Sequence, residues 1–171
     1  MKSVFFCLFL LTSLITSTAA ADEPVDAEAA FRILKSGLVG EWKGYIVHSS
    51  EAVEASFYLT GNDSAIVEYI RRPQKPAASM STVYHLADEY LQLTHFCSMQ
   101  NQPRLRAASV SPDGKTIDFE LLDVTNLTRS GNRYTHKMQI SFPAADKASV
   151  TYIGLDDGIE GQLTVELTRI D

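Results

Sequence analysis

Most of the chain alternates between apolar and polar residues, which is the pattern of half-buried β-strands. Turn-forming residues such as Gly61-Asn62-Asp63 and Asp156-Asp157-Gly158 separate the alternating segments. The predicted strands span residues 41–48, 52–59, 64–70, 79–87, 90–97, 104–110, 115–122, 133–142, 148–155 and 161–170. About ten short strands with no helix between them predict an all-β fold, either a sandwich or an up-and-down antiparallel β-barrel.

One short helix precedes the strands. Phe31, Leu34 and Leu38 are spaced at i, i+3 and i+7, so they form one apolar face of a helix predicted over 27–36. Asp26 is the expected N-cap and Gly37 the expected C-cap.

The first 21 residues have the organisation of a secretory signal peptide. Lys2 precedes an apolar run over 4–15, and residues 16–21 are small. The run is too short for a comfortable membrane span, and no later segment is longer. We therefore expect cleavage after Ala21, a secreted or periplasmic protein that does not span the membrane, and a single domain over 22–171.

Composition narrows the classes of function. The 171 residues are 45% hydrophobic and 21% charged, as in an ordinary globular domain. The formal net charge is −6 and no basic run is present, which argues against nucleic acid as a partner. The chain contains no nucleotide-binding, serine-hydrolase, zinc-protease or Cys-x-x-Cys motif, so no cofactor is predicted and an enzyme is not the leading expectation.

The turn at Asp88-Glu89 sets the register of the central hairpin. A two-residue turn pairs Leu86 with Leu91 and Thr82 with His95. The residues of this hairpin predicted to face inward are Met80, Thr82, Tyr84, Leu86, Leu91, Leu93, His95 and Cys97. Alternation over 133–142 adds His136, so we expect Thr82, Tyr84, His95, Cys97 and His136 to contribute to a ligand site inside the fold.

His95 and Cys97 are the strongest chemical candidates, because residues i and i+2 of a strand point the same way. They could bind a soft metal together with His136 or His48, or act as a base and a nucleophile. They could also line a partly polar interior and hydrogen-bond with Tyr84 or Thr82. Cys97 is the one cysteine of 22–171, and we expect it to be buried and inert.

Gln102 and Arg104 follow the same strand. The Gln102 amide could donate to a ligand or satisfy the loop backbone. A three-residue loop at the Asp113-Gly114 turn pairs Val110 with Thr116, which turns Ser109 inward. In this register Arg104 and Arg106 share the exterior face with Glu120 and Asp118, as an ion-pair ladder in which Arg106 lies opposite Glu120. A register one residue away would turn both arginines inward, where they would clamp an anionic ligand.

Two groups of motifs resemble known families. Leu38-Val39-Gly40-Glu41-Trp42-Lys43-Gly44 resembles the first strand of the lipocalin and fatty-acid-binding-protein superfamily. Thr82–Leu86, Leu91–Cys97, Asn101–Ala107 and Asp123–Leu127 are similar to a family of secreted bacterial proteins with a lipocalin-like domain. The resemblance implies a calycin-type barrel of about ten strands, in which Arg169 stacks on Trp42. It implies no established activity.

These observations predict a binding module that holds a small, partly apolar molecule inside the barrel. One alternative is an enzyme that uses His95, Tyr84 and Cys97 in the same cavity. The other is an interaction protein whose barrel is filled with side chains.

Overall fold

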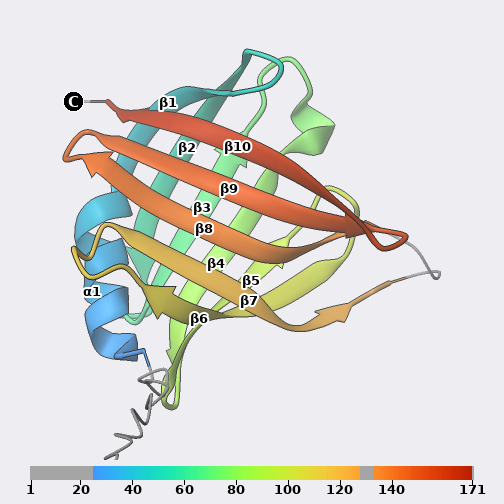
Figure 1. The fold of residues 1–171 in the computed structure, drawn as a ribbon. Coiled ribbons are helices and arrows are strands. Elements are labelled where there is room, and N and C mark those ends of the chain that lie inside the picture. The colour runs from blue at the N-terminus through green and yellow to red at the C-terminus, as the bar shows by residue number, and fades with distance from the viewer. Residues whose placement is uncertain (1–24, 128–132, 171) are drawn as a thin grey trace, which may run out of the picture.

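A closed barrel of ten antiparallel strands forms the protein, as the computed structural model shows (Figure 1). The model describes residues 25–127 and 133–170, and the predicted signal segment 1–21 lies outside them. The elements are α1 (Ala27–Leu38), β1 (Gly40–Ile46), β2 (Glu51–Thr60), β3 (Ala65–Arg71), the 3₁₀ turn η1 (Pro76–Ala78), β4 (Met80–Ala87), β5 (Tyr90–Phe96), β6 (Gln102–Val110), β7 (Thr116–Thr125), β8 (Tyr134–Ala144), β9 (Lys147–Asp156) and β10 (Ile159–Arg169). Each strand pairs with its neighbours in sequence, and β10 pairs with β1. The barrel is therefore of the up-and-down type, which confirms the predicted fold.

Helix α1 lies at one end of the barrel, opposite the turn between β9 and β10 (Figure 1). Asp26 caps the helix as predicted, accepting a hydrogen bond of 2.9 Å from the amide of Ala29. The predicted end at Ser36 and the Gly37 cap are wrong, because the helix continues to Leu38. Gly37 is needed for packing instead: a Cβ there would lie 2.5 Å from the Phe142 ring.

Arg169 and Trp42 hold the helix against the barrel. The Arg169 guanidinium lies 4.3 Å from the centre of the Trp42 ring, which confirms the predicted stacking. Arg169 also donates to the carbonyls of Gly37 (2.7 Å) and Val39 (2.6 Å), and the Trp42 indole donates to that of Leu38 (2.7 Å). These bonds satisfy helix C-terminal carbonyls that would otherwise lack partners.

The half of the barrel next to α1 is filled by side chains. The core packs α1 residues such as Leu34 and Leu38 against Trp42, Phe57 and Phe119 from the strands. At this end the interior of the barrel is filled, as the interaction-protein alternative expects for the whole barrel.

The central hairpin has the predicted register, with Leu86 opposite Leu91, Tyr84 opposite Leu93 and Thr82 opposite His95. Two details of the prediction are wrong. The strand predicted over 90–97 is one residue too long, because β5 ends at Phe96 and Cys97 lies beyond the paired residues. Leu86, which is predicted to face inward, is 38% exposed, because it lies next to the hairpin turn at the end of the strands, where alternation no longer determines burial.

Bulges make the pairing of β6 with β7 differ from the predicted register. Val110 pairs with Ile117 instead of Thr116, and a register shift follows between Ala107 and Ser109. Ser109, which alternation places inside, is therefore exposed. The shift restores the predicted pairing of Arg106 with Glu120 farther along the strands.

Candidate functional site

A cavity of about 350 Å³ lies at the end of the barrel opposite α1. Its walls come from the ends of β3, β5 and β9, the beginnings of β4, β8 and β10, and the segments that flank them. Its lining residues are His48, Arg72, Met80, His95, Cys97, Ser98, Met99, Arg133, Tyr134, Thr135, Tyr152, Gly154, Gly161, Gln162 and Leu163. In an up-and-down barrel these strand ends all lie at one end, which here is the end away from α1 (Figure 1).

Strand pairing brings Glu68, Thr82 and His95 side by side on the inner face of the barrel, at the base of this cavity. Glu68 in β3 is opposite Thr82 in β4, which is opposite His95 in β5. All three side chains point inward and are almost completely buried. Tyr84, two residues after Thr82, faces inward one step closer to the helix end.

Glu68 is the centre of a buried hydrogen-bond cluster. The Tyr84 hydroxyl donates to its Oε2 at 2.7 Å, and the Tyr152 hydroxyl reaches across from β9 to donate to its Oε1 at 3.0 Å. Burial raises the pKa of Glu68, and hydrogen bonds from Tyr84, Thr82 and Tyr152 offset part of that rise. Burial, together with the charge of Glu68, raises the pKa of both tyrosines well above the ordinary value, so they remain proton donors.

His95 lies between this cluster and the cavity. Its Nδ1 lies 3.0 Å from the Thr82 hydroxyl oxygen, and its ring centre lies 5.2 Å from that of Tyr152. The residue is 1% exposed, and burial lowers the pKa of His95 from 6.5 to about 4. The imidazole is therefore neutral at pH 7. Because Thr82 occupies Nδ1, Nε2 is the nitrogen available to a ligand.

Cys97 lines the cavity just beyond the end of β5. It is half-buried, where the sequence predicted full burial, because it follows the last strand residue. Burial raises the pKa of the Cys97 thiol, and the Met99 amide donates to its Sγ at 3.5 Å. The thiol is thus protonated at neutral pH and is a poor nucleophile.

His136 does not line the cavity, contrary to prediction. A register shift between Thr135 and Lys137 puts Thr135 on the inner face and changes the alternation before Met138. The Nε2 of His136 instead lies 3.0 Å from Oε1 of Glu160 in β10. Within residues 25–127 and 133–170, no three His, Cys, Asp or Glu side chains are grouped to hold a metal ion.

Gln102 and Arg104 also lie away from the cavity. Gln102 accepts hydrogen bonds from the Thr125 hydroxyl, at 3.1 Å, and from the Asn126 amide. Arg104 is exposed and pairs with Asp123, with 2.6 Å between Nε and Oδ1, where the prediction had Glu120 or Asp118. The cause is a register shift between Arg104 and Leu105. Arg104 thus belongs to an exterior ion pair and does not form an inward anion clamp.

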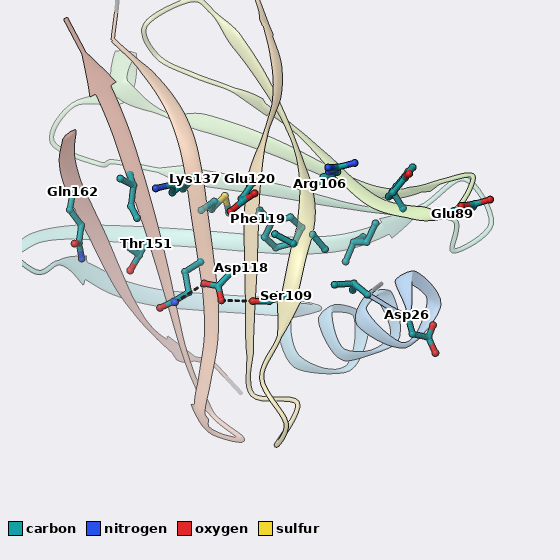
Figure 2. Close-up of a pocket in the computed structure, with 18 residues that line it drawn as sticks. Asp26, Glu89, Arg106, Ser109, Asp118, Phe119, Glu120, Lys137, Thr151 and Gln162 are labelled. Carbon is teal, nitrogen blue, oxygen red and sulfur yellow. Dashed lines mark hydrogen bonds between the residues drawn. The ribbon is translucent and has the colours of Figure 1, made fainter. Parts of the chain in front are cut away.

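A second hollow, of about 1090 Å³, extends over strands β5 to β10 (Figure 2). Its polar side chains already bind one another: Asp118 accepts hydrogen bonds from Ser109 (2.8 Å) and Gln139 (2.7 Å). The Arg106 guanidinium lies 5.3 Å from the centre of the Tyr90 ring. These groups are on the outside of the sheet and converge on no single point, so the cavity with His95 is the better candidate.

The chain matches no protein-family model, and no curated protein matches it. None of the helices in the described parts of the chain is long and apolar enough to cross a membrane.

Sequence reasoning missed Glu68, Tyr152 and the two cavity glycines, Gly154 and Gly161. A signal for Glu68 exists, because alternation places it on the inner face between Ile66 and Ile70. A charged residue at a core position is unusual and marks a candidate site.

Proposed function

We propose that this protein is a secreted or periplasmic binding protein that holds a small, partly apolar molecule in the cavity at the open end of its barrel. The observation that carries the proposal is the position of His95, which lines the cavity as a neutral imidazole with its Nδ1 engaged by Thr82 and its Nε2 left for a ligand. Small-molecule sites are typically apolar hollows of about 300–1,000 Å³ with a few convergent polar groups. The cavity fits this description, since Met80, Tyr152 and Leu163 line it beside His95.

Binding is favoured over catalysis by the state of the two reactive candidates. His95 has its Nδ1 engaged by Thr82, and the raised pKa of Cys97 keeps the thiol protonated. The proposed location depends on the signal-like residues 1–21, and the proposed membership of a lipocalin-like family depends on the motifs around Trp42 and His95.

Native mass spectrometry of the full chain, purified without denaturation, tests the function. We expect a non-covalently bound molecule that is lost on unfolding. His95→Ala is expected to lower its occupancy, because one orienting hydrogen bond contributes roughly 0.5–1.5 kcal/mol. His85→Ala is the matched control, since His85 is on the outer face of β4, where its Nδ1 contacts the Leu86 carbonyl oxygen at 3.0 Å.

Two results would contradict the proposal. One is equal occupancy in the wild type and His95→Ala. The other is a wild-type protein that carries no molecule and whose His95 ring resonances do not move in the presence of a small-molecule library.

A further inference from the structure

Two paired glycines form part of one wall of the cavity. Gly154 of β9 pairs with Gly161 of β10, and both line the cavity. Thr135 of β8 pairs with Gly154 on the other side, so three small residues lie in a row across three strands. Alternation turns this row inward, because Gly154 follows the buried Tyr152 by two residues.

The backbone does not require either glycine. Neither of them has a positive φ angle. A Cβ at Gly161 would meet nothing within 4 Å, whereas a Cβ at Gly154 would lie 3.6 Å from Cγ of Arg133 and from the Tyr134 carbonyl oxygen, which is ordinary contact. Glycine inside a strand costs about 0.5–1 kcal/mol relative to alanine and often marks the close approach of a ligand. The pair therefore keeps this wall flat, with open space over Gly161 and the aliphatic stem of Arg133 beside Gly154.

Three sulfur-bearing residues, Met80, Cys97 and Met99, also line the cavity. Met80 begins β4, and Cys97 and Met99 follow β5. In the ring of ten strands, β4 is opposite β9 and β5 is opposite β10, so the strands next to these sulfur atoms are across the barrel from the strands that carry the glycine pair. Thioether sulfur makes favourable contacts with aromatic rings, of about 0.3–1.5 kcal/mol.

Among the described residues that line the cavity, no arginine or carboxylate carries an unpaired charge. The two arginines are in ion pairs, Arg72 with Glu51 and Arg133 with Asp156. None of these described lining residues is Asp or Glu. A charged ligand group would lose hydration here without gaining a partner, which favours an uncharged ligand.

We propose that the ligand is an uncharged, planar aromatic molecule whose ring lies between the glycine pair and the sulfur-bearing side chains. A polar substituent of the ring hydrogen-bonds to Nε2 of His95. This inference rests on the proposed function and specifies the class of ligand that the cavity takes.

Two probes with the same carbon skeleton test the inference. 2-Naphthol is flat and aromatic, whereas trans-2-decalol is saturated, thicker and carries the same hydroxyl group. Binding to the full chain is measured by NMR titration. We expect 2-naphthol to bind at least about tenfold more tightly than the decalol, a difference of about 1.4 kcal/mol.

The matched variants are Gly161→Val and Thr164→Val. Gly161→Val puts a side chain into the open space over the flat wall. Valine is favoured in strands, so the variant should fold, and thermal melting verifies this. The second changes the outer face of the same strand, where the Thr164 hydroxyl contacts that of Thr151 at 3.1 Å. Gly161→Val is expected to weaken 2-naphthol binding about tenfold or more, and Thr164→Val to leave it unchanged.

Each contrary result has a distinct meaning. Equal affinity for the two probes, with both weakened by Gly161→Val, would overturn the aromatic class but keep the cavity as a binding site. The same conclusion follows if the purified protein carries a molecule that has no aromatic ring. Equal losses in Gly161→Val and Thr164→Val would overturn the location. Failure of both probes, with no bound molecule in the purified protein, would overturn this inference and the proposed function together.

Discussion

Replacing His95 with glutamine should change how the stability of the protein depends on pH. Burial lowers the pKa of His95 from 6.5 to about 4, so the folded protein keeps the ring neutral where the unfolded chain protonates it. Between pH 6.5 and pH 4 the unfolded state thus binds more protons, and stability falls as the pH falls. A span of 2.5 pH units corresponds to a loss of about 3 kcal/mol.

Urea denaturation at several pH values between 7 and 4 measures this effect. In the difference in unfolding free energy between the wild type and His95→Gln, the contributions of the other titratable groups cancel, because both proteins contain them. We expect the wild type to lose about 3 kcal/mol relative to the variant over this range. Glutamine retains a polar group near Thr82, so the fold should survive, and His85→Gln serves as the control. A difference that stays constant with pH would refute the reasoning, as would a His95 ring resonance that titrates near 6.5.

Three further predictions concern other buried groups. Glu68→Gln should have the opposite effect on pH dependence. Because the pKa of Glu68 is raised in the folded protein, the stability of the wild type falls as the pH rises above 4.5, by up to about 1.4 kcal/mol per pH unit. Chemical denaturation at several pH values should show that the variant lacks this slope. Arg169→Met should destabilise the protein by about 3 kcal/mol in urea denaturation, because the carbonyls of Gly37 and Val39 lose their charged donor and the Trp42 ring its cation; a loss below about 0.5 kcal/mol would count against this role. Cys97 should react with a thiol reagent far more slowly at pH 7 in the folded protein than in urea, since burial raises its pKa; equal rates would argue for an activated thiol.

Local pattern was sufficient for the fold and for much of the interior. Alternation and turn residues predicted the ten strands, and the short turn at Asp88-Glu89 predicted that Thr82 and His95 lie side by side. Both kinds of information act between residues close in sequence. The contact of Arg169 with Trp42 was also predictable, because the first and last strands must meet when a barrel closes.

Bulges could not be predicted, because one extra residue in a strand leaves no clear mark on composition. The shift after Thr135 removed His136 from the predicted site, and the shift beside Arg104 gave that residue a different partner, Asp123. Each shift reverses which face the following side chains occupy, so a single bulge changes several expectations at once.

Contacts across the barrel were decided by the tertiary structure alone. The hydroxyl of Tyr152 reaches Glu68, 84 residues away in sequence, only because β9 and β3 face each other across the closed ring. The cavity next to them exists because α1 fills one end of the barrel and the glycine pair leaves space at the other. Strand pattern determines which side chains point inward, whereas the closure of the barrel and the volume of those side chains determine which of them meet and where space remains.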